Sequence, residues 1–199
     1  MAPPRKHNTD RILDAARALV LRDGPRAASV AAIARESGAP VGTLYHRFGS
    51  RDKVLAAAWL RALERFQQRA LTAARHPDPL EAAVAMASSQ VSFAEEHPED
   101  AQLLLTLRRD DLLDADPDDG FRARLEAINA PLETTLAGLT KALRGRADAR
   151  AVDAVARAVV DLPNAAIRRH ARDGRRLPAW LGRDVAAAAR TLLQSQAEG

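Results

Sequence analysis

The chain has 199 residues, 47% of them hydrophobic and 4% aromatic, with ten glycines and no cysteine. This length can bury a sizeable core, and a texture rich in Ala and Leu but poor in Gly predicts an all-α protein. The lack of cysteine excludes disulfides, thiol catalysis and cysteine-based metal sites. No apolar run approaches the roughly 18 residues of a membrane span, and the N-terminus is short and polar, unlike a signal peptide, so we expect a cytoplasmic protein without a membrane partner.

The net charge of +4 conceals an asymmetry along the chain. Residues 1–53 hold ten Lys and Arg against five Asp and Glu, which leaves 20 basic and 21 acidic residues in the remainder. A positive excess at one end favours a polyanionic partner such as DNA. The alternative is that an Arg-rich composition by itself raises the isoelectric point.

The chain is expected to open with a polar arm and one helix. The arm, residues 2–7, either touches a DNA backbone or is merely solvated. The helix is predicted over 10–22, with Asn8 or Thr9 as its N-cap and a Gly-Pro pair at residue 24 ending it.

A short second helix follows from the spacing of Val30, Ile33 and Ala34, which places these residues on one face. Ser29 precedes them and can accept a hydrogen bond from an unpaired amide of the first turn. Gly38 then suits the left-handed position after a helix end.

The third helix is predicted to start at Pro40, where a missing N–H has no cost. Its buried face is expected to carry Val41, Leu44, Tyr45 and Phe48. The opposite face carries residues without apolar bulk and therefore needs a polar partner; these are Gly42, Thr43, His46 and Arg47. Two short helices joined by a glycine-containing turn, the second of them polar, are typical of a helix-turn-helix, although an ordinary helical hairpin has the same spacing.

The run IARESGAPVGTLYHRFGSRDKVL, residues 33–55, resembles the signature of the tetracycline-repressor (TetR/AcrR) family. In that family a helix-turn-helix leads through a Gly-Ser-Arg-like phrase into a long fourth helix. The resemblance implies that phosphate oxygens are bound by Ser29, Tyr45, His46 and by Arg51 or Lys53. It implies that Thr43 and Arg47 reach base edges, with Gly42 allowing close approach of the backbone.

Two features depart from the family pattern. The turn reads Gly-Ala-Pro where relatives commonly have Gly-Val-Ser, so one phosphate-binding hydroxyl is missing. Ala31 and Ala32 stand where many relatives place a base-reading polar residue. Operator recognition is therefore expected to depend mainly on the third helix.

The remainder of the chain is predicted to be helical, separated by Pro, Gly and charged runs. The expected helices cover residues 51–75, 79–96, 99–113, 120–143, 148–173 and 179–196. Pro131 is expected to kink or break the seventh helix. The acidic stretch 110–119 is expected to be a loop; it lacks the ordered spacing of a calcium site, so a solvated surface is favoured over a metal site.

The organisation expected is a helix-turn-helix domain, residues 1–54, followed by a helical ligand-binding and dimerisation domain, residues 55–199. The last two helices carry small apolar stripes that either form a core hairpin or, as the resemblance implies, pair with a second copy across a two-fold axis. The candidate interface residues are Val155, Val159, Leu162, Val185, Ala189 and Leu192.

The resemblance also implies an inducer cavity walled by the fourth to eighth helices. The apolar candidates are Trp59, Phe66, Met86, Phe93, Phe121 and Ile128, and the polar candidates are Gln90, His97, Arg108, Asn164 and Arg168. For each apolar residue, ordinary core packing is the alternative.

No nucleophile elbow, phosphate loop, dinucleotide fingerprint or zinc-protease motif is present, so we expect no enzyme, no cofactor and no metal. The sequence is interpreted as a ligand-responsive transcriptional repressor. It is expected to bind a palindromic DNA operator as a homodimer and to be released by a small, mostly apolar effector. A helical ligand-binding or adaptor protein without specific DNA binding is the alternative.

Overall fold

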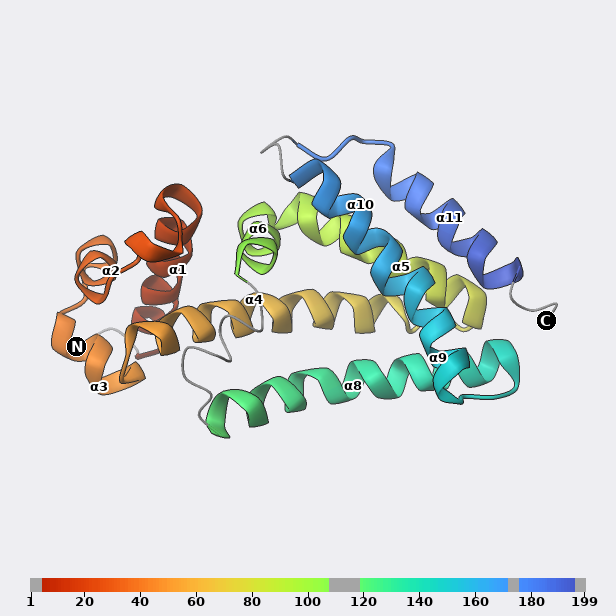
Figure 1. Cartoon of the computed structure of the whole chain (residues 1–199), viewed down its shortest axis with the longest axis horizontal. Coiled ribbons are helices and arrows are strands. Elements are labelled where there is room, and N and C mark those ends of the chain that lie inside the picture. Colours follow the sequence, from red (N-terminus) through yellow and green to blue (C-terminus); the bar gives the residue numbers. More distant parts are fainter. Residues whose placement is uncertain (1–4, 108–118, 172–175, 196–199) are drawn as a thin grey trace. The chain divides into compact units, whose positions relative to one another are not determined.

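The computed structural model describes residues 5–107, 119–171 and 176–195, and every regular element in these ranges is a helix (Figure 1). Each of the nine predicted helices has a counterpart there. The chain forms two compact units, one of Met1–Leu63 with Glu99–Leu125 and one of Glu64–Pro98 with Glu126–Gly199. The predicted functional boundary after residue 54 stays a prediction.

The first unit contains three N-terminal helices and parts of three more. Its elements are α1 (Arg5–Asp23), the 3₁₀ turn η1 (Pro25–Ala27), α2 (Val30–Ser37), α3 (Val41–Phe48), the start of α4 (Arg51–Ala73), α6 (Pro98–Thr106) and the start of α8 (Asp119–Arg144). α1 packs on α2, and α2 packs on α3. The core of this helix-turn-helix includes Ile12, Ile33 and Leu44, each no more than 1% exposed.

Local capping signals fix the turns of the helix-turn-helix. The hydroxyl of Ser29 accepts the Ala32 amide at 3.2 Å, and Gly38 ends α2 in the left-handed conformation with φ of 69°. Gly49 ends α3 with φ of 81°, and the Ser50 hydroxyl accepts the Lys53 amide at 3.2 Å. The predicted roles of Ser29 and Gly38 are confirmed, and Gly49 and Ser50 follow the same local rules, because each depends only on neighbouring residues.

The expectation for the start of α1 is wrong. Helix α1 begins at Arg5, so residues 5–7 are helical rather than part of an arm, and Thr9 lies inside the helix instead of capping it. The Thr9 hydroxyl accepts a hydrogen bond from Arg47 at 2.7 Å. The Thr9 side chain therefore makes a tertiary contact with Arg47 instead of the helix cap that the sequence predicted.

The second unit is built around α5 (Pro79–Glu96), which is buried along most of its length. It also contains the end of α4, most of α8, α9 (Ala149–Ala156), the π-helical segment η2 (Arg157–Asp161), α10 (Leu162–Ala171) and α11 (Leu181–Ser195). α5 packs against α11, α10 and η2 (Figure 1). α8 continues through Pro131, so the predicted break does not occur there.

The sixth helix is shorter than predicted. α6 ends at Thr106, and most of the predicted acidic loop, residues 110–118, lies outside the described residues. Only Asp119 of that stretch is described, as the first residue of α8. The eighth predicted helix is present as a continuous helical run from Ala149 to Ala171. Its middle segment, η2, is π-helical, and α9 and α10 on either side of it are α-helical.

That π-helical turn is tied to α5 by a buried side chain. Pro163 has no N–H, so it cannot supply the amide that an α-helix would give to the Val159 carbonyl four residues earlier. The Nε2 group of Gln90, only 4% exposed, donates to this carbonyl at 2.5 Å. Gln90 therefore satisfies a buried acceptor that Pro163 leaves without its usual partner.

Candidate functional site

Helix α3 exposes more apolar surface than its spacing predicted. Of the four residues assigned to its buried face, Leu44 is 1% exposed and Phe48 is half-buried, whereas Val41 is 43% and Tyr45 54% exposed. A helix of two turns has only one side against α2, so the stripe was drawn too wide. The exposed Val41 and Tyr45 lie one turn apart, and Val41 is a candidate for contact with a thymine methyl group that the sequence analysis missed.

The polar residues of α3 lie beside this stripe. Gly42 and His46 are exposed, and Thr43 is half-buried. A Cβ atom added at Gly42 would meet nothing within 4 Å, so no neighbour among the described residues requires glycine there. The half-buried Arg47 donates through Nη1 to the hydroxyl of Thr9 in α1, which leaves its other donors available for a base.

Arg51 makes hydrogen bonds within the chain that its sequence context did not predict. Its Nε donates to the Ala28 carbonyl at 2.9 Å, its Nη2 to the Pro25 carbonyl, and its Nη1 to the Asp52 carboxylate at 2.5 Å. The guanidinium thus holds the start of α4 against the turn that precedes α2. A phosphate contact from Arg51 or from Lys53 in the same first turn of α4 stays a prediction.

Ser29 is predicted both to cap α2 and to bind a phosphate oxygen. Its oxygen caps α2 by accepting the Ala32 amide, while the residue itself is exposed. A hydroxyl has one hydrogen to donate besides its acceptor lone pairs. The cap and a phosphate contact are therefore compatible.

A cluster of ion pairs that the sequence analysis missed holds α1 in the first unit. Arg17 binds Asp100 of α6, whose side chain is 3% exposed, and lies 2.6 Å from the Glu99 carboxylate. Arg61 of α4 binds Asp10 at 3.0 Å and Asp14 at 2.5 Å. The signal in the sequence was weak, because these partners are separated by 47 to 83 positions.

Two of the predicted cavity residues, Trp59 and Phe121, pack together in the first unit. Each is 7% exposed, their ring centroids are 6.5 Å apart, and the Trp59 indole donates to the Leu107 carbonyl at 3.1 Å. In the second unit Phe66 meets Phe93 edge to face at 5.4 Å. Core packing, the alternative left open by the sequence, accounts for these contacts.

The other cavity candidates are placed in three ways. Met86 is 1% exposed, Gln90 binds the Val159 carbonyl, and Ile128 is half-buried. Asn164 and Arg168 are exposed, and their contact with an effector stays a prediction. In α10 the buried positions are Pro163 and Ile167. Arg108 lies outside the described residues.

Most of the predicted dimer residues lie in the core of a single chain. Val155, Val159, Val185 and Ala189 are at most 3% exposed, so they cannot contact a partner without opening the helix pair. Leu162 is half-buried and Leu192 is 36% exposed. The stripe was assigned to the wrong face because periodicity shows that a helix has an apolar side but not what covers it.

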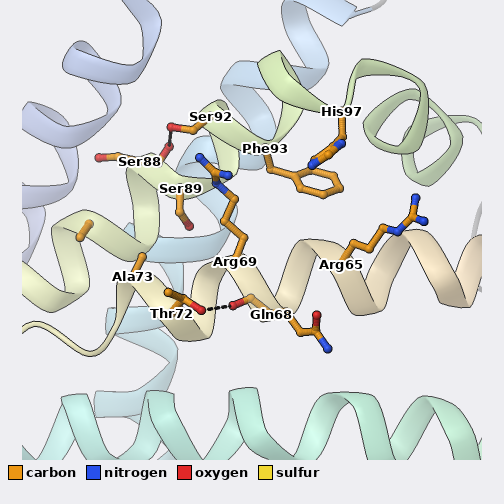
Figure 2. A pocket seen from close by; sticks show the side chains of 11 residues that line it. Arg65, Gln68, Arg69, Thr72, Ala73, Ser88, Ser89, Ser92, Phe93 and His97 are labelled. Atoms are coloured by element: carbon orange, nitrogen blue, oxygen red, sulfur yellow. Dashed lines mark hydrogen bonds between the residues drawn. The ribbon is translucent and has the colours of Figure 1, made fainter.

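A groove of about 930 Å³ lies between α4 and α5 within the second unit (Figure 2). From α4 it is lined by Arg65, Gln68, Arg69, Thr72 and Ala73, and from α5 by Ala85, Ser88, Ser89, Ser92, Phe93 and His97. The small residues of α5 leave space that the long side chains of α4 only partly fill. Of the predicted cavity residues, the groove includes Phe93 and His97 and otherwise consists of residues that were not predicted.

The described residues show neither a metal site nor a membrane span. No group of three or more His, Asp or Glu side chains among them could hold an ion. Likewise, no described helix combines the length and apolarity needed to cross a bilayer.

A helix-turn-helix with an exposed second helix, followed by a larger helical unit, is the architecture of a helix-turn-helix transcriptional regulator. Residues 12–58 match the model of the bacterial regulatory proteins, tetR family. No curated protein matches the sequence.

Solved structures match over nearly the whole chain. A TetR-like transcriptional regulator from a Rhodococcus species is 20% identical with a TM-score of 0.69, covering 100% of both chains. The TetR family transcriptional regulator PfmR from Thermus thermophilus is 25% identical with a TM-score of 0.64, covering 93% of this chain and 98% of its own. The regulator FadR from Bacillus subtilis, solved with stearoyl-CoA, is 16% identical with a TM-score of 0.65, covering 96% and 98%. The helix-turn-helix therefore matches the TetR family model, and the fold of the whole chain resembles that of TetR-family regulators.

Proposed function

We propose that this chain is a ligand-responsive repressor that binds a palindromic operator as a homodimer. The observation that carries the proposal is the surface of α3, where Tyr45 and His46 are exposed beside Gly42 and Val41. This helix lies in the part of the chain that holds the excess of positive charge. Such a helix suits the major groove, and the charge suits the phosphate backbone.

The test is selection of bound sequences from a random duplex library, followed by a salt titration on the selected duplex. We expect a palindrome whose half-sites lie about one helical turn, roughly 34 to 36 Å, apart. Binding without an enriched sequence, lost as salt rises, would support the alternative of a helical ligand-binding or adaptor protein.

Two substitutions in α3 separate base contacts from phosphate contacts. Arg47→Ala is expected to relax base preference at one position of each half-site, with a loss of about 1 to 3 kcal/mol on the preferred base. His46→Ala is expected to weaken binding to all sequences alike. Equal losses on selected and random duplexes for both variants would contradict these assignments.

We propose that the homodimer uses the outer faces of α9, η2 and α11 rather than the buried stripe. Ala156 and Val160 on one side, and Ala187, Ala188 and Leu192 on the other, are partly or fully exposed small and apolar residues. Val160→Glu with Leu192→Glu is expected to yield a monomer by light scattering without unfolding the chain. A dimer that persists in this variant would place the interface elsewhere.

We propose that the effector is a small molecule bound in the second unit. A ligand with different affinities for two conformations shifts α4, which has residues in both units, and changes the spacing of the two recognition helices. A mostly apolar effector stays a prediction of the sequence. The groove described between α4 and α5 is lined mainly by polar side chains, so it does not suit a mostly apolar effector.

A further inference from the structure

The groove between α4 and α5 is lined by basic side chains. Arg65 and Arg69 are one turn apart on α4, and His97 follows the last residue of α5 (Figure 2). None of the eleven described lining residues is a carboxylate. The lining therefore favours an anion over a neutral or cationic ligand.

Arg69 is held by a carboxylate just outside this lining. Its Nη1 and Nη2 donate to the two oxygens of Glu96 at 2.5 and 2.6 Å, in a fork-to-fork arrangement. The two side chains are 37% and 52% exposed. Exposed ion pairs contribute little to stability, so a ligand anion can take the place of Glu96 at small cost while preserving the bidentate geometry.

The hydroxyl groups of the groove mostly present acceptors. Ser88 and Ser89 donate their hydrogens to carbonyls of α5 at 2.9 and 2.7 Å. Thr72 donates to the Gln68 carbonyl at 2.8 Å and Ser92 to the Ser88 carbonyl at 3.4 Å (Figure 2). A hydroxyl has a single hydrogen, so its lone pairs are what remain for a ligand. The uncharged part of the ligand is therefore expected to carry O–H or N–H donors.

The apolar surface of the groove is small. Its largest apolar residue, Phe93, is only 2% exposed and is covered by Phe66 and by the His97 ring at 5.2 Å. The remaining apolar lining is Ala73 and Ala85. A long alkyl chain would gain little from burial here.

We propose that this groove binds a small carboxylate- or phosphate-bearing molecule that also carries hydroxyl or N–H donors, and that its anionic group replaces Glu96 on Arg69. The interpretation of this groove as the effector site rests on the proposed regulatory function. Binding of the anion itself does not depend on DNA and can be measured without it.

The test follows the Arg side-chain N–H signals of the full chain by NMR during titration with inorganic phosphate. Glu96→Gln removes the competing carboxylate and is expected to bind phosphate 3- to 10-fold more tightly than wild type. Arg69→Ala is expected to bind it at least tenfold more weakly. The matched control is Asp153→Asn, which frees Arg157 from an exposed ion pair between α9 and η2, away from the groove, and is expected to leave phosphate affinity unchanged.

The ligand class is tested with glucose 6-phosphate, glucuronate and glucose. Glucose 6-phosphate is expected to bind at least threefold more tightly than inorganic phosphate, because its hydroxyls can donate to the serine oxygens, and glucose is expected not to bind. Tighter binding of glucuronate than of glucose 6-phosphate would assign the anion as a carboxylate.

Three results would overturn parts of the proposal. Equal phosphate affinity of Glu96→Gln and Asp153→Asn would exclude exchange at Arg69. Equal affinity for inorganic phosphate and glucose 6-phosphate would exclude recognition of the donors. Binding of glucose as tight as that of its phosphate would exclude an anion site. Because these measurements contain no DNA, a failure to select an operator would refute the proposed function and leave the anion site standing.

Discussion

The bond from Gln90 to the Val159 carbonyl gives a quantitative prediction about the second unit. Replacing Gln90 by Met keeps nearly the same side-chain volume but removes the donor. Gln90 is 4% exposed and Val159 is 0% exposed, so water cannot replace the lost hydrogen bond. An unsatisfied buried acceptor costs about 1 to 3 kcal/mol, and we expect the free energy of unfolding of Gln90→Met to fall by that amount.

The measurement is urea unfolding followed by circular dichroism at one protein concentration, because association would otherwise shift the midpoint. Gln67→Met is a matched control on α4. Gln67 is also 4% exposed and donates to Asn129 at 2.7 Å, but its own oxygen has no partner in the described residues. Removing this oxygen relieves a buried unsatisfied group, so the control should cost less than Gln90→Met.

A double-mutant cycle with Pro163 tests the reason for the effect. Pro163→Ala restores an N–H that can bind the Val159 carbonyl, so Gln90→Met should cost at least about 1 kcal/mol less in that background. Additive costs in the double variant would refute the idea that Gln90 compensates for the proline. A cost below about 0.5 kcal/mol for Gln90→Met alone would mean that the carbonyl finds another donor.

Three further predictions concern other positions. Arg51→Lys keeps the charge but cannot span the two carbonyls before α2, so it should lower the free energy of unfolding by about 1 to 2 kcal/mol in urea; an unchanged midpoint would mean that the clamp is dispensable. Gly38→Ala should cost about 1 to 2 kcal/mol in thermal unfolding because alanine is strained at φ of 69°. The hydrogen bonds from Arg190 lower the pKa of Glu81, so their contribution is full above the ordinary glutamate pKa and is lost as pH falls through the lowered value. Stability measured from pH 6 to pH 3 should therefore fall less steeply in Glu81→Gln, and identical slopes would contradict this.

Local patterns in the sequence predicted the helix-turn-helix well. The caps at Ser29 and Ser50 and the glycines that end α2 and α3 depend on backbone groups within four residues, so the residue types alone indicate them. Asp148 caps α9 in the same local way, with its carboxylate accepting the Ala151 amide at 3.0 Å. The family signature lies in the same stretch as the helix-turn-helix.

The candidate sites were predicted less well, because periodicity identifies an apolar side without identifying its partner. Val155 and Val185 belong to stripes that were correctly recognised as apolar, yet they pack inside one chain. Val41 was expected to be buried but is exposed, since α3 is too short for its whole apolar side to be covered. Asn164 was named as a candidate for the effector cavity, and it is exposed beside the buried Pro163.

The sequence by itself therefore determined the helices, most of their ends and the resemblance of the helix-turn-helix to one family, since these depend on hydrogen bonds and spacings between near neighbours. Only the tertiary structure decided what the polar side chains do. Gln90 is 69 positions from Val159, and Arg69 is 27 positions from Glu96. Such partners meet because the helices pack, and no local pattern encodes which donor will face which acceptor.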